Sequence, residues 1–219
     1  MPKIVDAEAR RQEVVEAVFR IIASDGLERA SLREVADEAG LAVGSVRHYF
    51  ASSDELLVHS FAVVIDRIAT RLEEAFAVVE SLDHASAEHD DAVLTLLGQF
   101  LPLDEESAVD ACVWMAFRHA ARIRPVLEEE AARSHRAVAA VVGRLVMRLM
   151  RDAGTRQERL VTEAERLLST LDGLCMHALL QPEWMTFEVC RDVLSAHLDS
   201  LLSPVQPLTS RLIGNRLEP

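Results

Sequence analysis

Residues 31–50 read SLREVADEAGLAVGSVRHYF, and this stretch has the pattern of two short helices joined by a tight turn. Ser31 and Glu34 predict a capping box, in which the serine oxygen accepts from the Glu34 amide and the glutamate reaches back to the Ser31 amide. Gly40 can adopt the left-handed conformation that ends a helix. A second helix must then begin near Val43, because only a sharp corner separates the two apolar patterns. This spacing predicts a helix-turn-helix.

The second of these helices has polar side chains where a DNA-reading helix needs them. Val46 and Phe50 are expected to be buried, and Val46 packs where the first helix offers the small Ala36. Arg47 and His48 then remain available for phosphates and base edges. An ordinary helical hairpin with glycine at its turn is the alternative interpretation. The residues expected to contact DNA are Ser31, Arg33, Val43, Ser45, Arg47, His48, Tyr49 and Ser53.

Helical periodicity continues on both sides of the hairpin. A helix is expected over about 7–24, and Ser52 with Glu55 has the spacing of a further helix start, which opens a long helix to about residue 81. The chain has only 8 Gly and 7 Pro, which favours long helices over sheets. After a loop over 82–90, the all-α fold is predicted to continue with helices over about 91–101, 105–123, 126–152, 155–180 and 186–202.

Three segments together resemble the N-terminal domain of the tetracycline-repressor (TetR) family: 32–40 (LREVADEAG), 43–50 (VGSVRHYF) and 55–57 (ELL). The resemblance covers about the first 60 residues. It implies an all-helical homodimeric transcription regulator, usually a repressor, whose C-terminal domain binds a small molecule and thereby releases the DNA operator. The chain departs from the family pattern at Arg47, where many members carry tyrosine, and at Ala51 and Ser53, where lysines are common.

The resemblance also implies a division of the chain. Residues 1–51 are expected to form the DNA-binding domain, residues 52–203 a helical ligand-binding and dimerisation domain, and residues 204–219 a loose tail. Residues 172–180 (DGLCMHALL) resemble the dimer-forming penultimate helix of one bacterial branch of the family. An intramolecular bundle is the alternative for the last two helices. The residues expected at the dimer interface are Leu167, Leu171, Leu174, Cys175, Ala178, Val193, Leu194, His197 and Leu201.

One expected helix combines aromatic side chains with a cation. Trp114, Phe117 and Arg118 fall on one face, and an aromatic wall with one positive charge suits an apolar or anionic small molecule. Ordinary core with a surface arginine is the alternative interpretation. The residues expected to line a ligand site are Phe61, Ile65, Phe100, Trp114, Met115, Phe117, Arg118 and Val142, several of them on family geometry alone.

The charge balance does not by itself favour DNA. The net charge is −13, and residues 1–60 hold seven Lys or Arg against eleven Asp or Glu. This acidity supports a second hypothesis, a helical ligand-binding or interaction module without sequence-specific DNA binding. A homodimer would instead present its cations to two major grooves about 34–36 Å apart, which favours a palindromic double-stranded operator. The cations expected to share one face are Lys3, Arg10, Arg11, Arg33, Arg47 and His48.

Other function classes are disfavoured by the sequence. No apolar run reaches the roughly 18 residues that cross a bilayer, and the N-terminus alternates charged with apolar residues, so a cytoplasmic protein without a membrane partner is expected. The three cysteines are expected to be reduced core thiols. His84 and His89 are placed in the polar loop, and Cys175 and His177 are two apart on a helix, whereas metal ligands on a helix are usually three or four apart. The chain lacks the glycine-loop, zinc-protease and serine-elbow motifs, so no enzyme activity, cofactor or metal is expected.

Overall fold

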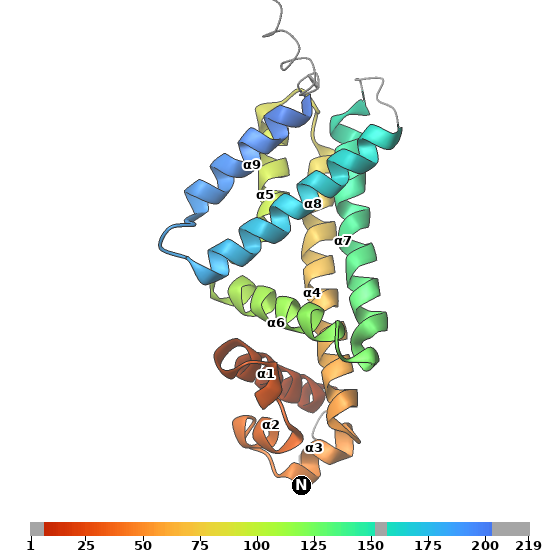
Figure 1. Cartoon of the computed structure of the whole chain (residues 1–219), viewed down its shortest axis with the longest axis vertical. Helices are drawn as coiled ribbons and strands as arrows, with labels where there is room; N and C mark the ends of the chain where they lie inside the picture. Colours follow the sequence, from red (N-terminus) through yellow and green to blue (C-terminus); the bar gives the residue numbers. More distant parts are fainter. Residues whose placement is uncertain (1–6, 152–156, 203–219) are drawn as a thin grey trace, which may run out of the picture.

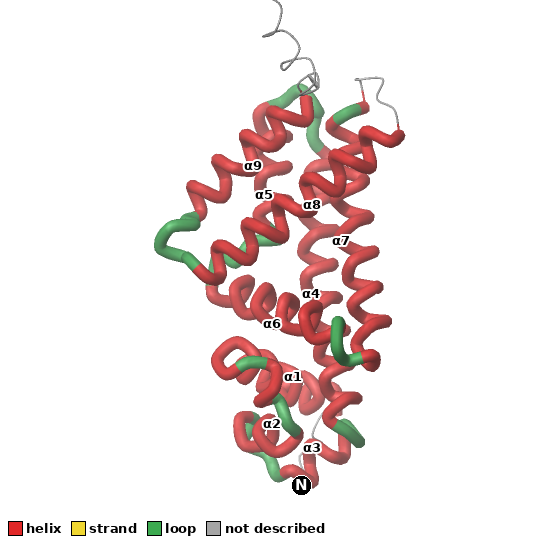
Figure 2. The backbone as a smooth tube through the Cα atoms, viewed as in Figure 1, coloured by secondary structure: helices red, strands yellow, loops and turns green. Residues whose placement is uncertain are grey.

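The structure is a computed structural model that describes residues 7–151 and 157–202, and all regular structure within those ranges is helical (Figures 1 and 2). The all-α prediction is therefore confirmed. The predicted loose tail over 204–219 lies outside the described residues. The helices are α1 (Ala7–Asp25), α2 (Leu32–Glu38), α3 (Val43–Tyr49), α4 (Ser53–Ser81), α5 (Ala87–Gly98), α6 (Glu105–Ala121), α7 (Glu128–Leu149), α8 (Gln157–Leu180) and α9 (Phe187–Leu202), with 3₁₀ turns at Leu27–Arg29 and Pro125–Leu127.

Helix α4 joins the two ends of the molecule. Its 29 residues span about 43 Å, because an α-helix rises about 1.5 Å per residue. Helices α1 to α3 cluster at its N-terminal end, while α5, α7 and α8 lie at the other end (Figure 1). Helix α4 contacts α1, α5, α6 and α7, and one continuous set of buried apolar residues runs through both regions. The predicted boundary between residues 51 and 52 therefore coincides with the start of α4, but it is not a break in the core.

The N-terminus of α2 forms only half of the predicted capping box. The Ser31 hydroxyl oxygen accepts from the Glu34 amide at 3.3 Å, as expected. The Glu34 carboxylate does not reach the Ser31 amide, because that amide donates to the Arg29 carbonyl of the preceding 3₁₀ turn at 2.8 Å. Glu34 instead accepts from the Ser31 hydroxyl at 2.8 Å and pairs with the Arg29 guanidinium at 2.8 Å. The turn at residues 27–29 thus replaces the second half of the box.

The fifth helix begins earlier than its composition suggested. Residues 82–90 were expected to form a loop, but α5 starts at Ala87 and ends at Gly98. The Ser86 hydroxyl accepts from the His89 amide at 3.1 Å, and acidic residues occupy the first turn, where they interact favourably with the helix dipole. A polar sequence therefore forms a helix start here. His89 consequently lies in the helix and is fully buried, so its placement in the loop was wrong.

The buried His89 side chain connects three elements. Its ring stacks on His84 with centroids 4.9 Å apart, and its Nε2 accepts from Arg148 Nε of α7 at 3.4 Å. Arg148 also donates to the carbonyl oxygens of Val79 and Leu82 at the end of α4. Burial, reinforced by the charges of His84 and Arg148, lowers the pKa of His89, although Asp90 acts in the opposite direction. The His89 imidazole is therefore neutral, as it must be for its Nε2 to accept a hydrogen bond from Arg148.

No helix within residues 7–151 and 157–202 is long and apolar enough to span a membrane.

We expect the free energy of unfolding to decrease as the pH falls below 6.5, the ordinary pKa of histidine. The unfolded chain binds the His89 proton at a higher pH than the folded chain does, so acid favours unfolding until the lowered folded-state pKa is passed. Chemical denaturation at pH 7.5 and 5.5 measures the effect, and His89→Gln should make the pH dependence shallower. His119→Gln, at an exposed histidine, is the control; an equal change in both variants would contradict the assignment.

Candidate DNA-binding surface and ligand cavity

The turn between α2 and α3 fixes the direction in which α3 presents its side chains. Gly40 has φ of 66°, and the Leu41 amide donates to the Ala36 carbonyl at 2.8 Å. Ala36, Val46 and Phe50 are fully buried, and α3 packs against α2. The predicted helix-turn-helix geometry is therefore present.

The predicted DNA contacts differ in their exposure. Ser45, Arg47 and His48 of α3 are exposed, and so is Arg33 of α2. Tyr49 is half-buried, and its ring meets His48 edge-on with centroids 5.3 Å apart. The remaining predicted residues, Ser31, Val43 and Ser53, are half-buried. Only four of the eight predicted residues are therefore exposed to solvent.

Two of the cations that the sequence placed on one face already have contacts within the chain. Arg10 is paired with Glu13 at 2.5 Å, and the Arg11 guanidinium lies 5.0 Å from the centre of the Phe50 ring. Lys3 lies outside the described residues. Among the residues that the structure describes, neither Arg33 nor Arg47 has an ion-pair partner. These two arginines, with His48, are therefore the cations best placed for DNA.

Two carboxylates of the N-terminal region are paired with cations from outside residues 1–60. Glu28 pairs with Arg124, after α6, at 2.7 Å, and Glu16 of α1 pairs with Arg67 of α4. The pairs Arg20–Glu38 and Arg29–Glu34 each use a cation of the region itself, so they leave its acidic excess unchanged.

The start of α4 offers less to a phosphate than the sequence indicated. Ser52 caps the helix by accepting from the Glu55 amide at 3.1 Å. The Glu55 carboxylate accepts from the Ala51 amide at 2.7 Å, which places a negative charge directly at the helix N-terminus. A phosphate approaching Ser53 would therefore meet a carboxylate as well as the positive end of the helix dipole.

Two cavities in the C-terminal region share the Trp114 side chain as a wall. One of about 120 Å³ lies between α4, α6 and α7, and another of about 20 Å³ is lined by α4, α6, α7, α8 and the residues after α5. The Trp114 Nε1–H donates to the Ser134 hydroxyl of α7 at 2.6 Å, which fixes the indole between them. Both cavities are also lined by Ile68 and Val138. The Trp114 indole thus separates two mostly apolar cavities.

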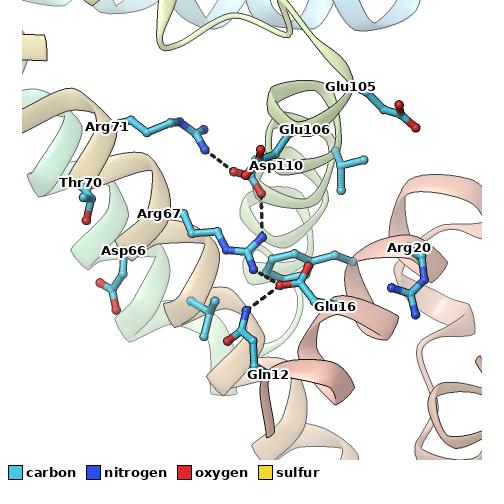
Figure 3. A pocket seen from close by; sticks show the side chains of 13 residues that line it. Gln12, Glu16, Arg20, Asp66, Arg67, Thr70, Arg71, Glu105, Glu106 and Asp110 are labelled. Atoms are coloured by element: carbon cyan, nitrogen blue, oxygen red, sulfur yellow. Dashed lines mark hydrogen bonds and ion pairs between the residues drawn. The ribbon is translucent and has the colours of Figure 1, made fainter. Parts of the chain in front are cut away.

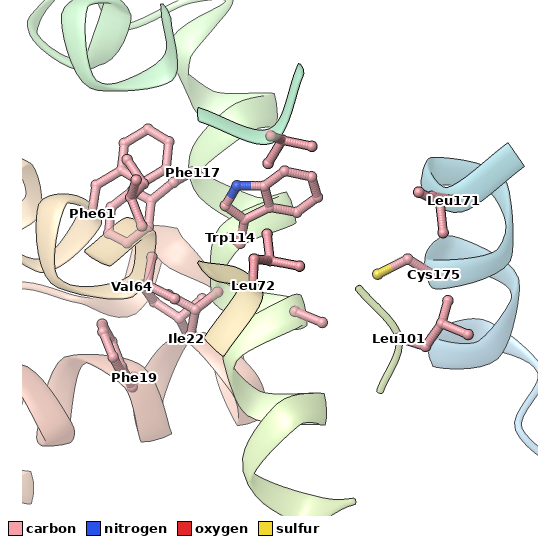
Figure 4. Close-up of a cluster of buried hydrophobic side chains, with 14 of the residues drawn as sticks. Phe19, Ile22, Phe61, Val64, Leu72, Leu101, Trp114, Phe117, Leu171 and Cys175 are labelled. Carbon is pink, nitrogen blue, oxygen red and sulfur yellow. The ribbon is translucent and has the colours of Figure 1, made fainter. Parts of the chain in front are cut away.

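Only some of the predicted ligand residues reach this space. Ile65 lines the larger cavity, Phe100 the smaller one, and Trp114 lines both. Phe61 and Phe117 instead stack on each other in the core, with ring centroids 4.8 Å apart (Figure 4). Val142 is buried and Met115 half-buried, and neither lines the two cavities.

Arg118 does not supply the positive charge of the cavity. Its guanidinium lies 4.3 Å from the centre of the Trp114 ring and pairs with Asp172 of α8 at 3.1 Å, so it ties α6 to α8 from outside the cavity. Arg71 is the cation that lines the smaller cavity, and the sequence reasoning missed it. Arg71 follows Ile68 by three positions on α4, so helical spacing from that apolar face could have identified it.

Cys175 forms part of the same wall as an inert thiol. Burial, and to a smaller extent the nearby Asp172, raises the pKa of Cys175 to about 12. The side chain therefore stays protonated and acts as a small apolar group. Cys175 and Cys190 are buried, as predicted for core thiols, whereas Cys112 is only half-buried.

A cleft of about 920 Å³ is lined by α1, α4 and α6, and a charged network crosses it (Figure 3). Arg67 of α4 pairs with Glu16 of α1 and lies 3.6 Å from Asp110 of α6. Arg71 donates to Asp110 at 2.5 Å, and the Asp110 side chain is 1% exposed. Arg71 lines both this cleft and the smaller cavity. The DNA-binding helices and the cavity are therefore connected through one buried carboxylate.

Most residues predicted at the dimer interface are already buried within the single chain. A side chain without accessible area buries nothing further on association, so these residues would add little area to an interface, and their part in a dimer stays a prediction. Buried in this way are Leu167, Leu171, Leu174, Cys175, Ala178, Leu194 and Leu201.

The last two helices also carry apolar residues that remain exposed. Val193 is the predicted interface residue that stays exposed, while His197 is half-buried and its Nδ1 lies 3.1 Å from the Thr170 hydroxyl. The sequence reasoning did not select the others, which lie at or near the turn between α8 and α9, except for Val161 near the start of α8. The exposed apolar residues of this region are Val161, Met176, Leu180, Trp184, Phe187 and Val193.

Two family models match the chain. Residues 14–59 match the model described as "Bacterial regulatory proteins, tetR family", and residues 89–203 match "BetI-type transcriptional repressor, C-terminal". Together the two matches cover the helix-turn-helix and most of the region that contains the cavities.

Relatives match along nearly the whole chain. The HTH-type transcriptional regulator PksA of Bacillus subtilis is 33% identical over 92% of this chain and 94% of its own length. The HTH-type transcriptional regulator BetI of Vibrio campbellii is 26% identical over 93% and 97%. A crystal structure of a transcriptional regulator from Rhodococcus sp. Rha1 is similar with a TM-score of 0.74, at 28% identity over 90% of this chain and 99% of that one.

These similarities agree with the helix-turn-helix geometry and extend beyond it to the cavity-bearing helices. The chain belongs to the TetR family and is a ligand-responsive, DNA-binding transcriptional regulator.

Proposed function

We propose that the protein is a repressor that binds a palindromic operator as a homodimer and leaves it when a small molecule fills the cavities beside Trp114. The observation that carries DNA recognition is the exposure of Arg33 and Arg47 on α2 and α3, without ion-pair partners among the described residues. Arginine suits this role because its fork of donors binds phosphates and guanine edges. Binding to chromosomal DNA places the protein in the cytoplasm.

A second candidate function, a ligand-binding module that has lost DNA recognition, rested on the acidic composition. Glu16 and Glu28 are paired with Arg67 and Arg124, which lie outside residues 1–60, so the rest of the chain neutralises part of that acidic excess. The acidic composition therefore gives little reason to prefer a ligand-binding module without DNA recognition.

The exposed apolar residues around the turn between α8 and α9 are the proposed homodimer contact. Trp184 is 74% exposed and Phe187 50% exposed, and Leu180 at the end of α8 is 73% exposed. Exposed aromatic groups of this size are characteristic of interaction surfaces. Two copies related by a two-fold axis would cover them with the same residues of the partner.

Replacing Arg47 by alanine should weaken operator binding and make it less dependent on salt. Losing a phosphate contact reduces the slope of log K against log salt by about one, and losing a contact to a base reduces discrimination between sequences. Fluorescence anisotropy on DNA from the gene's own upstream region, with a scrambled duplex as control, measures both at about 50 and 200 mM salt.

Arg20→Ala is the matched control for this measurement, because Arg20 is also exposed but is paired with Glu38 on the side of α1. We expect it to bind the operator like the unchanged protein. Equal affinity and equal salt slope in Arg47→Ala would show that α3 does not read the operator as proposed.

Replacing Trp184 by serine should shift the protein from dimer to monomer. Large aromatic side chains dominate interface energies, so we expect the dimer dissociation constant to rise at least about tenfold. Sedimentation velocity across a concentration series measures the change. Ile123→Ser removes an apolar side chain that is 71% exposed in the turn between α6 and α7. Equal behaviour of the two variants would exclude the proposed contact.

A further inference from the structure

A further cavity, of about 160 Å³, lies where α9 packs on α5 (Figure 1). Leu101 and Leu194 in its wall are buried, whereas Leu103 and Phe187 are exposed, so the cavity has an apolar floor and opens at the surface. An apolar cavity of about 150 Å³ is large enough to hold benzene. The space between α5 and α9, called the α5–α9 cavity below, can therefore receive one aromatic ring.

An exposed indole lies next to this cavity in the chain. Trp184 is 74% exposed and does not line the cavity, whereas Phe187, three positions later, does. Apolar surface in contact with water favours association with other apolar surface. The turn between α8 and α9 and the first turns of α9 thus combine a projecting aromatic side chain with an apolar recess.

Two-fold symmetry makes such a surface complementary to itself. In a homodimer of this symmetry, a contact from one residue to another is repeated in the opposite direction between the same two residues. Because Trp184 and the α5–α9 cavity lie on the same part of the chain, one such contact buries both indoles and fills both cavities. The single chain does neither, since its own Trp184 lies outside its own cavity.

The polar residues of the cavity suit an indole. Arg191 is exposed in the cavity wall, and guanidinium groups bind favourably over the face of tryptophan. The Gln99 amide nitrogen donates to the Thr95 carbonyl oxygen at 3.4 Å. The Gln99 side-chain oxygen therefore remains an acceptor for an indole N–H, which needs a partner once it is buried.

Charges on the two sides of this contact are also complementary. Glu183 precedes Trp184, is exposed, and has no ion-pair partner among the residues that the structure describes. Arg191 pairs with Asp91 of α5 at 2.7 Å, and both side chains remain largely exposed. An indole placed in the α5–α9 cavity brings the neighbouring carboxylate toward the Arg191 guanidinium. The chemistry of the cavity therefore matches a second copy of this chain.

We propose that each subunit of the homodimer inserts its Trp184 indole into the α5–α9 cavity of the other subunit. This inference rests on the proposed function, because it assumes the homodimer, and it adds the place that receives the exposed tryptophan. The six-membered ring of the partner's Trp184 packs on Leu101 and Leu194, while Arg191 covers its face at the surface.

Two substitutions of Trp184 test whether the contact needs a ring. Trp184→Ala removes the ring and should raise the dimer dissociation constant at least about tenfold. Trp184→Phe keeps a six-membered ring and should stay within about threefold of the unchanged protein. Sedimentation velocity across a concentration series measures both constants.

Filling the cavity tests the receiving side of the contact. Thr95 of α5 lines the cavity with an exposed side chain, so Thr95→Phe places a ring of the same chain in the space. We expect its dissociation constant to lie within about threefold of the Trp184→Ala value. Glu88→Phe is the matched control, because Glu88 is exposed two turns earlier on the same face of α5 and does not line the cavity. It should dimerise like the unchanged protein.

The emission of Trp184 reports its burial independently. The chain has two tryptophans, so Trp114→Phe leaves Trp184 as the only one. We expect quenching by acrylamide to decrease as the protein concentration passes through the dissociation constant. Thermal unfolding shows whether each variant is folded, and Leu103→Phe fills the same cavity from the loop after α5 if Thr95→Phe is not.

A cavity-filled variant that dimerises like Glu88→Phe, while Trp184→Ala is monomeric, would overturn the inference and leave the proposed dimer contact intact. Equal quenching of Trp184 in monomer and dimer would overturn it as well. A dimer that Trp184→Ala does not weaken, or a protein that is monomeric at every concentration, would reject the proposed contact together with the inference. Operator anisotropy on the same preparations shows separately whether DNA binding is retained.

Discussion

Helix α4 is one unbroken α-helix from Ser53 to Ser81, and both parts of the molecule pack on it. Near its start Leu56, Leu57 and Phe61 are buried, and beyond its middle Leu72 and Phe76 are buried in the C-terminal region. Because the backbone hydrogen bonds of a helix resist bending, a displacement of one end of α4 is carried to the other. The position of α3 relative to the rest of the molecule therefore depends on how α4 is held.

The buried Asp110 carboxylate helps to hold helix α4 in place. Removing a carboxylate from water is costly, and the cost is offset here by Arg67 and Arg71 on successive turns of α4. Arg67 also pairs with Glu16, so the same network fixes α1 and α6 to α4. Such directional contacts allow fewer relative positions of the three helices than apolar packing alone would, since each ion pair depends on orientation as well as proximity.

The helix-turn-helix could be predicted from sequence because its determinants are local. Gly40 must permit a left-handed turn, Ala36 must be small, and Val46 must be buried, and all three lie within eleven residues. The start of α5 was also encoded locally, but the cap at Ser86 was obscured by the polar composition around it. Both the helix-turn-helix and the start of α5 were thus signalled locally. The predicted start of α5 was wrong because the polar composition of residues 82–90 outweighed the cap at Ser86.

The cavity and the last two helices depend on contacts between residues distant in sequence. Arg71 and Asp110 are 39 residues apart, and Arg118 and Asp172 are 54 apart. Periodicity showed that Trp114 and Arg118 share a face, but not that Asp172 would take the arginine out of the cavity. Likewise it identified the apolar face of α8, containing Leu167 and Leu171, but not that this chain's own helices would cover it.

The junction between the two regions has an exposed ion pair besides its buried network. Glu28, next to α2, accepts from Arg124 after α6 at 2.7 Å, and the Glu28 side chain is 77% exposed. An exposed ion pair of this kind contributes at most about 1 kcal/mol to stability. The attachment of the DNA-binding helices to the rest of the chain therefore depends mainly on the buried carboxylate of Asp110 and its two arginines.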